Sequence, residues 1–399
     1  MLPLNGIRVV DLTRYLSGPY CAMYLGDMGA DIIKIEHPTE GDSSRRWGSG
    51  PYPADNPYYL AVNRNKRSIG LDLKSKAGLK VLEDLICKSD VLLINSISGA
   101  LEQLGLSQDR IRALNPRLVL CQITAYGDHG PNARRGALDF VIQAESGMMS
   151  LTGEPEGSPM KVGAPVMDVL TGMNACIAVQ AALFQRQVTG VAPTVSTSMM
   201  ETALASMPNV VSDYLVGGIM PGRHGNAHPN IAPYEIYETQ DHWLAFGMGN
   251  ELQWVRFCEL INRSDIKQDS RFVTNVERIE NREKLNEQLK PIFAAQSLHW
   301  WMRTLTEIGI PCAAVNSVPD ALASEQVQAL DLVKPVPHLL YGTLQMVRSP
   351  LNFDGAPLEI RRAPPCLGQH TDEILVEVLG LGATAVAELR AVRAVAGGA

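Results

Sequence analysis

Asp168 is the side chain whose type and position best suit chemistry on a ligand. It ends the run Gly163-Ala164-Pro165-Val166-Met167-Asp168 and directly precedes an apolar stretch that is predicted as a helix to about Arg186. An acid at a helix start can cap the free amides of the first turn, or it can face a ligand held there and act as a catalytic group. From the residue types alone, capping is the favoured interpretation.

A short basic segment is a candidate phosphate-binding surface. Residues 64–80 hold one acid, Asp72, against six bases: Arg64, Lys66, Arg67, Lys74, Lys76 and Lys80. The whole chain has a formal net charge of −7, so a polyanion must meet a local basic patch, and no nucleic-acid partner is expected. The alternative, which composition alone favours, is a solvated strand edge and helix face.

Gly247-Met248-Gly249-Asn250 is a candidate flap over a ligand. It follows a short predicted strand and precedes a predicted helix, and its glycines would let the backbone approach a bound molecule. As a plain strand-to-helix turn it needs no function. His224 and His228 lie four residues apart, but the glycines and prolines around them oppose a helix that presents both to a metal. They are interpreted as polar loop residues.

Several common catalytic patterns are absent from the sequence. There is no GxGxxG after the first predicted strand, no GxxxxGK[ST] and no GxSxG. A nicotinamide or flavin dehydrogenase, a P-loop nucleotide triphosphatase and a serine hydrolase therefore have little support. The seven cysteines lie more than thirty positions apart, which leaves no zinc-ligand spacing, and no metal site is expected. Scattered thiols of this kind fit buried side chains in a reducing compartment.

Composition predicts a globular protein of about two to three domains. The chain has 399 residues, of which 46% are hydrophobic and 19% are charged, values that oppose disorder. Its closest approach to a membrane span, Gly172 to Phe184, is broken by Asn174 and Gln180. The first predicted strand starts almost at once, with no signal segment before it, so the expected location is the cytoplasm.

Strand-like and helical segments alternate through the first half of the chain. Strands are predicted at 7–12, 31–36, 68–73, 91–95 and 118–124, with helices near 19–28, 77–87 and 108–114. Repeated βαβ units imply an α/β fold with a parallel, doubly wound, Rossmann-like sheet. Ligands of such sheets bind beyond the carboxyl ends of the strands.

Domain boundaries are predicted from shifts in composition. Residues 1–200 are assigned to the N-terminal part of a large Rossmann-like domain. Residues 201–232 are assigned to a linker, because Gly217 to Pro233 hold four glycines and three prolines. Two short strands and helices rich in Asn, Glu and Arg assign 233–325 to a smaller α+β domain. Residues 326–399 are assigned to a second linker and a C-terminal part that returns to the large domain.

Seven segments resemble the class III CoA-transferases, the formyl-CoA transferase-like or CaiB/BaiF family, in the same order along nearly the whole chain. They are Leu4 to Leu12 with Ser17-Gly18-Pro19, Gly29 to Glu36, Asn63 to Ile69, Gln143 to Gly147, Pro165 to Asp168, Gly249-Asn250 and Leu367 to Thr371. No single segment is specific, but seven in register are. The resemblance implies a homodimer of two chains threaded through each other as interlocked rings.

The same resemblance implies that Asp168 is the catalytic nucleophile. In that family an aspartate attacks the donor thioester to form a mixed anhydride, the CoA thiolate converts the anhydride to an enzyme thioester, and an acceptor carboxylate reverses the sequence. A free aspartate titrates near ~3.9, so Asp168 would need no separate base at pH 7. Asp139 is assigned a supporting role, with loop capping as an equal alternative. Gly247 and Gly249 are assigned to a cover that excludes water, and oxyanion donors are expected at a helix start or in this glycine loop.

The family's CoA contacts map onto this chain with two departures. The aligned positions are Arg14, Ser17, His37, Leu71, Lys74, Asn95, Ile97, Gln103 and Leu104. Gln103 replaces an arginine and Ala137 replaces a lysine, so the bases Arg64, Lys66 and Arg67 are hypothesised to compensate. Coenzyme A and acyl-CoA are implied as substrates, and no permanently bound cofactor is implied.

The exchanged acids are narrowed to a class. The chain is most similar to members that use succinyl-CoA and a dicarboxylate such as glutarate, itaconate, malate, citramalate or mesaconate, and Leu16 in place of a glutamine opposes formyl-CoA:oxalate exchange. Arg14, Arg46 and Arg223 are unranked candidates to bind a distal carboxylate. One alternative is an α-methylacyl-CoA racemase, which Leu138 opposes because it replaces the catalytic histidine. The other is an acyl-CoA-binding protein without activity.

Overall fold

The chain folds into two compact units in a computed structural model that describes residues 1–48, 51–52 and 54–397. The first unit comprises Met1–Ser146, Val162–Ser212 and Asp331–Ala399, and the second comprises Gly147–Lys161 and Asp213–Leu330. Each unit has a hydrophobic core of its own. The first unit therefore contains both the N-terminal and the C-terminal part of the chain.

A seven-stranded sheet forms the centre of the first unit. Its strands are β1 (Arg8–Asp11), β2 (Asp31–Glu36), β3 (Lys66–Leu71), β4 (Val91–Asn95), β5 (Val119–Thr124), β6 (Thr194–Ser198) and β14 (Val395–Ala396). They stand in the order β14-β3-β2-β1-β4-β5-β6, and every neighbouring pair is parallel except β14 with β3. The predicted parallel α/β sheet is confirmed.

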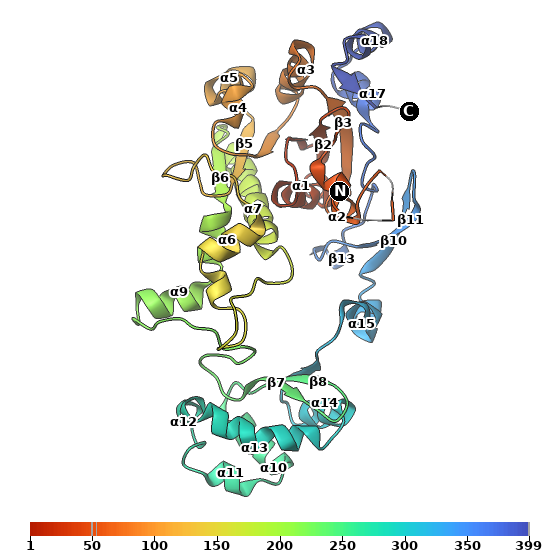
Figure 1. The fold of residues 1–399 in the computed structure, drawn as a ribbon. Coiled ribbons are helices and arrows are strands. Elements are labelled where there is room, and N and C mark those ends of the chain that lie inside the picture. The colour runs from red at the N-terminus through yellow and green to blue at the C-terminus, as the bar shows by residue number, and fades with distance from the viewer. Residues whose placement is uncertain (49–50, 53, 398–399) are drawn as a thin grey trace. The chain divides into compact units, whose positions relative to one another are not determined.

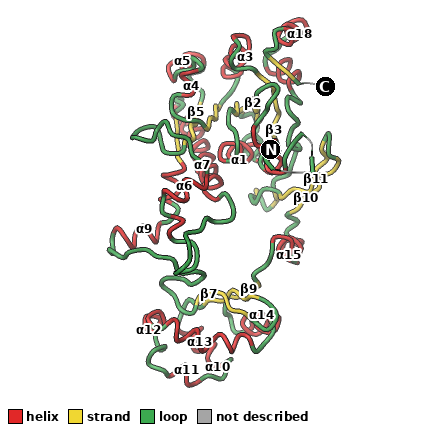
Figure 2. The backbone as a smooth tube through the Cα atoms, viewed as in Figure 1, coloured by secondary structure: helices red, strands yellow, loops and turns green. Residues whose placement is uncertain are grey.

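Helices cover both faces of this sheet and alternate with its strands (Figures 1 and 2). Helices α1 (Ser17–Asp27) and α7 (Val166–Thr189) pack on one face, and α3 (Lys76–Cys87), α4 (Ala100–Gln103), α5 (Gln108–Leu114), the π-helical turn η3 (Ile374–Val378) and α18 (Ala383–Ala391) pack on the other. The unit also contains the 3-10 turn η1 (Ser43–Arg46), α2 (Pro57–Ala61), α6 (Asp139–Glu145), α8 (Met199–Ala205) and α17 (Thr371–Glu373). Helix α9 (Pro208–Leu215) runs from the first unit into the second. Most of α8 and all of α9 fall in the segment predicted as a linker.

Successive strand residues pack into two different cores. Val9 packs with α1 and α7 on one face of the sheet, whereas Val10 packs with α3 and the C-terminal turn η3 on the other. Ile32 and Ile33 divide between the two faces in the same way. Side chains alternate along a strand, so a strand covered on both faces must be apolar at consecutive positions. These apolar runs are the pattern from which the strands were predicted.

The strand order changes direction between β1 and β4. In doubly wound sheets, ligands bind in the crevice outside the carboxyl ends of the strands at this switch point. Asn95, the last residue of β4, joins the two halves of the sheet here. Its Oδ1 accepts the N–H of Arg14 (2.8 Å), and its Nδ2 donates to the carbonyl of Arg14 (2.5 Å). The turn after β1 is thereby bound to the end of β4.

Two fully buried lysines hold the segment that links β1 to α1. The Nζ of Lys66 donates to Oδ2 of Asp11 (3.1 Å) and to the carbonyl of Pro19 (2.9 Å). The Nζ of Lys34 donates to the carbonyl of Thr13 (2.8 Å). Burial lowers the pKa of Lys66 to about 8, even though Asp11 opposes this shift. The start of the linking segment and the first turn of α1 are therefore bound by ammonium groups that water does not reach.

A second group of ion pairs continues from these lysines. Arg45 donates to both carboxylate oxygens of Glu36 (2.8 and 2.7 Å) and pairs with Asp55. Asp42 pairs with Lys34 (3.0 Å), and its N–H donates to Glu36 (3.0 Å). This connected buried group holds four carboxylates and three bases, which are Asp11, Glu36, Asp42, Asp55, Lys34, Lys66 and Arg45.

The C-terminal segment of the first unit packs against β3. It forms two antiparallel hairpins, β10 (Val333–His338) with β11 (Gly342–Val347) and β12 (Asn352–Phe353) with β13 (Ala356–Pro357). Ser68 of β3 then receives the passage before α17. Its Oγ accepts the N–H of Gly368 (2.9 Å), and its N–H donates to Nδ1 of His370 (3.2 Å). The passage 367–371 is thus bound to the sheet by backbone and side-chain hydrogen bonds.

The second unit is built around an antiparallel sheet of three strands, in the order β7 (Tyr234–Glu238), β8 (Trp243–Gly247) and β9 (Cys312–Ala314). The aromatic rings of Phe257, Phe293 and Trp301 pack together in its core. Its helices are the 3-10 turn η2 (Met148–Ser150), α10 (Glu251–Leu260), α11 (Ser264–Gln268), α12 (Asn275–Glu280), α13 (Arg282–Ala294), α14 (Leu298–Glu307), α15 (Val318–Ala323) and α16 (Glu325–Ala329).

Helix α7 packs as a core helix of the first unit. Its 24 residues are long and apolar enough to cross a membrane by length and composition alone, a test that core helices of soluble proteins also pass. Ala175, Val179 and Ala182 are buried against α1 and the sheet. Gly190, at φ +76°, ends the helix in the left-handed conformation that glycine favours.

We predict that Lys66→Met lowers the free energy of unfolding by about 3–5 kcal/mol, because it leaves Asp11 buried without its main partner. Lys76→Met, which removes an exposed lysine at the start of α3, should change it by at most about 0.5 kcal/mol. Chemical denaturation of both variants tests this expectation. Equal stabilities would show that the buried pair does not hold the fold.

Candidate active site

The first turn of α7 is capped by Asp139 and not by Asp168. Asp168 is the third residue of the helix, and Pro165 before the helix provides no side-chain cap. Oδ2 of Asp139 accepts the N–H of Met167 (2.7 Å) and the N–H of Asp168 (3.2 Å). The capping interpretation of Asp168 is therefore wrong, and its carboxylate is available for another role.

Asp139 is positioned by α6, of which it is the first residue. Its Oδ1 accepts a hydrogen bond from Nε2 of Gln143, one turn along the helix. Gln143 is buried, and its Oε1 accepts the N–H of Val162 (2.8 Å) in the passage before α7. Asp139 thus caps the start of α7, as the capping alternative predicted, and its supporting role beside Asp168 remains a prediction.

The start of α1 packs closely against the start of α7. A Cβ added at Gly172 would lie 2.5 Å from the carbonyl oxygen of Ser17, so only a glycine permits this approach. The hydroxyl and the N–H of Ser17 donate hydrogen bonds to the carboxylate of Asp168. Ser17 was predicted as a CoA contact, and the structure places it, buried, against Asp168.

The environment of Asp168 makes its carboxylate more basic than a free one. Burial raises the pKa of Asp168, the negative charge of Asp139 raises it further, and the hydrogen bonds from Ser17 oppose both effects. The resulting pKa is about 6, against an ordinary value of 3.8. The Asp168 carboxylate is still mostly ionised at pH 7. Its higher basicity makes it a better nucleophile than a free carboxylate.

Tyr58 of α2 is a site residue that the sequence analysis missed. Burial is the main cause that raises the pKa of Tyr58 to about 12, and the negative charges of Asp168 and Asp139 raise it further. The phenol is therefore within electrostatic range of both carboxylates. The ring of Tyr58 also contacts Trp47 (5.2 Å between ring centroids), which stacks on Tyr15 (5.4 Å). Asn56 and Pro57 are typical of a helix start, but no sequence signal links this helix to Asp168.

The basic segment 64–80 is not a phosphate-binding surface along its whole length. Three of its bases are buried, each with an aspartate: Arg64 with Asp27 (2.6 Å), Lys66 with Asp11 (3.1 Å) and Arg67 with Asp31 (2.6 Å). The hypothesis that these three compensate for missing CoA contacts is therefore wrong. Lys74 and Lys76 are exposed.

The aligned CoA positions gather at the carboxyl edge of the sheet. Arg14 and Ser17 follow β1, His37 follows β2, Leu71 ends β3 with Lys74 just beyond it, Asn95 ends β4 with Ile97, Gln103 and Leu104 beyond it, and Ala137 lies between β5 and α6. Parallel strands end at the same edge, which brings together residues that the sequence keeps far apart. Their contact with CoA remains a prediction.

The glycine flap belongs to the second unit. Gly247 ends β8, and the N–H of Gly249 donates to Oε1 of Gln253 (2.8 Å). The role of both glycines as a cover remains a prediction. In the same unit, His228 accepts the N–H of Asn230 at its Nδ1 (3.1 Å), as expected for a polar loop residue.

Two of the three arginines proposed for a distal carboxylate are engaged by backbone carbonyls. Arg46 donates to Glu40 (2.8 Å), and Arg223 donates to the carbonyls of Glu154, Pro155 and Gly157. The guanidinium of Arg14 instead lies over the ring of Tyr15, 5.6 Å from its centroid, at the switch point of the sheet. Arg14 is thus the candidate at the same edge as the aligned CoA positions.

A comparison with known families assigns the chain to one of them. The family model of CoA-transferase family III matches residues 4–371. The chain belongs to CoA-transferase family III. It is a CoA-transferase, as the seven segments predicted.

Similar proteins cover nearly the whole of this CoA-transferase. A succinate–glutarate CoA-transferase of Agrobacterium fabrum is 37% identical over an alignment of 394 residues. The alignment covers 96% of this chain and 97% of that one. A succinyl-CoA:glutarate CoA-transferase of Mus musculus is 35% identical over 389 residues, with 98% and 89% covered. The structure of a CaiB/BaiF family protein from Brucella suis is 34% identical, has a TM-score of 0.84 and covers 94% of this chain and 99% of that one.

The position that would carry the racemase histidine holds Leu138 in this CoA-transferase. Leu138 precedes α6 and is largely exposed, and its side chain has no group that can transfer a proton. Among the residues described near Asp168, the geometry thus adds no support for racemase chemistry.

We predict that Asp168→Asn makes the protein more stable at pH 7.5 by about 1–3 kcal/mol. The folded-state pKa is about 6 and the unfolded value is 3.8, so the folded state binds the proton more tightly. The stability contributed by Asp168 is therefore present at low pH and is lost as the pH rises through about 6. The advantage of the variant should shrink as the pH falls from 7.5 toward 4, as measured by denaturation at each pH.

Asp109→Asn is the matched control, because Asp109 is an exposed acid in the first turn of α5. Its loss should cost about 0.3–1 kcal/mol at pH 7.5, through the lost interaction with the helix dipole. A destabilised Asp168→Asn variant at pH 7.5 would contradict the prediction and restore a structural role for Asp168.

Proposed function

We propose that the enzyme transfers CoA from succinyl-CoA to a small dicarboxylate, in the class that includes glutarate, itaconate, malate and citramalate, with Asp168 as the covalent nucleophile. The observation that supports this proposal is the carboxylate of Asp168 at the start of α7. It is partly buried, it does not cap the helix, and its pKa is about 6. The names of the relatives, which include two transferases acting on succinate or succinyl-CoA and glutarate, support the substrate class.

The reaction runs through two kinds of acyl-enzyme bond. A carboxylate oxygen of Asp168 attacks the thioester carbonyl of succinyl-CoA, and the C–S bond breaks to leave a mixed anhydride and the CoA thiolate. The thiolate attacks the Asp168 carbonyl carbon, releases succinate and forms an aspartyl-CoA thioester. The acceptor carboxylate attacks this thioester, and the freed thiolate then attacks the acceptor carbonyl. The new acyl-CoA leaves, and the Asp168 carboxylate is restored.

Ser17 is the proposed donor for the oxyanions that form on Asp168. Each attack on the Asp168 carbonyl carbon makes a tetrahedral oxyanion, which needs preorganised donors. The first amides of α7 are occupied by Asp139, so they do not serve as these donors. The hydroxyl and the N–H of Ser17 already donate to the Asp168 carboxylate. The phenol of Tyr58, whose pKa is raised by the charges of Asp168 and Asp139, is proposed as a further donor to these oxyanions.

Substrate binding is assigned to the carboxyl edge of the sheet. Lys74 is exposed just beyond β3 and is the proposed phosphate partner, since the bases of 64–67 are buried. Arg14 is the proposed partner of the distal carboxylate of the acceptor. Gly247 and Gly249 are proposed to cover the site and to keep water from the anhydride and the thioester.

The enzyme is proposed to act as the interlocked homodimer that the resemblance implies. In support, the outer face of α7 exposes Met173, Ile177, Phe184 and Val188. These residues recur at about helical spacing, so they form one apolar stripe. Exposed apolar surfaces of this kind mark protein–protein contacts.

We expect new acyl-CoA thioesters when the purified protein is incubated with succinyl-CoA and a panel of C2 to C6 monocarboxylates and dicarboxylates. Mass spectrometry should show a product with a dicarboxylate such as glutarate. Asp168→Asn should reduce exchange by at least about 10³-fold while the protein stays folded, and Asp109→Asn should leave it unchanged. Full activity of Asp168→Asn would refute the mechanism. Release of free CoA alone would refute the transfer to these acids.

Lys74→Glu should raise the KM for succinyl-CoA by about ten- to hundredfold, because it replaces a charge-assisted contact to phosphate with repulsion. Lys88→Glu is the control, since Lys88 is also exposed but lies at the other end of α3, just before β4. Steady-state kinetics with varied succinyl-CoA measures both. An unchanged KM in Lys74→Glu would remove Lys74 from the CoA site.

A further inference from the structure

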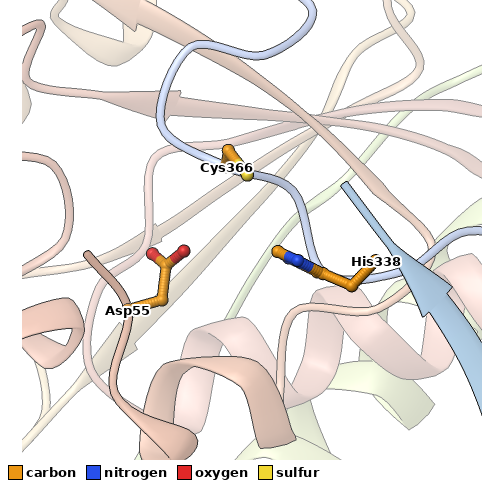
Figure 3. A group of neighbouring side chains, drawn as sticks. All are labelled: Asp55, His338 and Cys366. Carbon is orange, nitrogen blue, oxygen red and sulfur yellow. The ribbon is translucent and has the colours of Figure 1, made fainter. Parts of the chain in front are cut away.

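Three side chains from distant parts of the sequence converge within the first unit. Asp55 precedes α2, His338 ends β10, and Cys366 lies in the passage before α17. One carboxylate oxygen, one imidazole nitrogen and the thiol sulfur all lie within 4.8 Å of one another. Figure 3 shows the three side chains pointing toward one another from their separate segments.

The imidazole of His338 is buried, and one of its nitrogens is poorly satisfied. His338 is 7% exposed, and its Nε2 makes no hydrogen bond of good geometry among the described residues, although the backbone of Pro364 raises the pKa of the ring. A buried polar atom without a partner costs free energy, so it calls for an explanation. Nδ1 of His338 accepts the N–H of Leu340 (3.2 Å), so this nitrogen carries no proton and the ring is neutral. A neutral imidazole is the form that binds a metal ion.

The cluster also lies next to a buried group in which carboxylates outnumber bases. Asp55 is at the end of the buried group that holds four carboxylates and three bases. Arg45 is its cationic neighbour and donates to it, but the same guanidinium also makes two hydrogen bonds to Glu36. One negative charge in this group is therefore left over. A cation next to Asp55 would neutralise it.

We propose that Asp55, His338 and Cys366 bind a divalent transition-metal ion, with Zn²⁺ as the best fit. Carboxylate oxygen, imidazole nitrogen and thiolate sulfur are the three ligand types that Zn²⁺ takes in proteins. The outer contacts are in place, since Tyr341 donates to Oδ2 of Asp55 (3.0 Å) and stacks on His338 (4.6 Å between ring centroids). Such outer partners orient the ligands of metal sites.

Binding requires two protons to move. The thiol of Cys366 must lose its proton to solvent as the sulfur binds the metal, because the thiolate is the form that ligates. Nδ1 of His338 accepts the N–H of Leu340 (3.2 Å), and ligation through Nε2 transfers the ring proton to Nδ1. The N–H of Leu340 then needs a new acceptor, and Leu340 is 58% exposed at the tip of the hairpin, where water can supply one.

The ion would act as a structural clip. It would join the segment before α2, the β10–β11 hairpin and the C-terminal passage, which no disulfide joins in the described residues, where all seven cysteines are free. Helix α2 carries Tyr58 beside Asp168, so the clip would also hold one wall of the candidate active site. The sequence spacing that excludes a local zinc motif does not exclude ligands from three separate segments.

Titration of the untagged, EDTA-treated full-length protein with Co²⁺ tests the proposal. We expect one equivalent to bind, with a thiolate-to-cobalt charge-transfer absorption that Zn²⁺ displaces. Cys366→Ser and His338→Gln should abolish both signals, and Tyr341→Phe should weaken the affinity by about 10- to 100-fold. Cys312→Ser, at another partly buried thiol, should bind as the wild type does.

A second measurement needs no variant. Zn²⁺ should protect Cys366 of the wild-type protein from alkylation, as read by mass spectrometry, while the exposed Cys87 in the same sample is alkylated equally with and without Zn²⁺. The absence of stoichiometric Co²⁺ binding, an unchanged spectrum in a folded Cys366→Ser variant, or equal alkylation of Cys366 with and without Zn²⁺ would each overturn the proposal.

Discussion

The hydrogen bonds from buried Lys34 and Lys66 to the carbonyls of Thr13 and Pro19 are the constraint on which the candidate active site depends. Moving an ammonium group out of water is costly, and an imperfect set of partners would not recover that cost. The segment between β1 and α1 therefore has one arrangement that satisfies both lysines. That arrangement presents Ser17 to the carboxylate at the start of α7. Buried charge here contributes to a unique geometry more than to net stability.

A division of tasks between two aspartates follows from the packing of α1 against α7. Asp139 satisfies the amides of the helix start, so Asp168 is not consumed by capping. The same contact places two negative charges close together and, with burial, raises the pKa of Asp168 to about 6. The folded protein thus holds the Asp168 carboxylate where its ionised form is disfavoured. This is a common arrangement for a group that must react. Hydrogen bonds from Ser17 limit the shift, so the group remains ionised at pH 7.

The buried charges extend from these lysines to the proposed metal ligands. Asp42, Glu36 and Arg45 connect the Lys34 end of the network to Asp55, which precedes α2. Tyr58 is on the following helix, and the charges of Asp168 and Asp139 raise its pKa. The network therefore supports the site from two sides, through the turn that carries Ser17 and through the helix that carries Tyr58.

The amino-acid sequence by itself determined the parallel α/β sheet, the bounds of most strands and, through seven segments in register, the family and Asp168 as its candidate nucleophile. These features rest on short-range patterns, because side-chain alternation and helical spacing are read within a few residues. Only the tertiary structure decided which charges are solvated: Arg64 and Arg67 look like a phosphate surface in the sequence, and each is buried with an aspartate more than thirty residues away. Only the tertiary structure placed Tyr58 beside Asp168 and brought Cys366 to its two potential co-ligands. The role of a charged or polar side chain depends on partners that the fold supplies over long distances in the chain, and no local pattern records them.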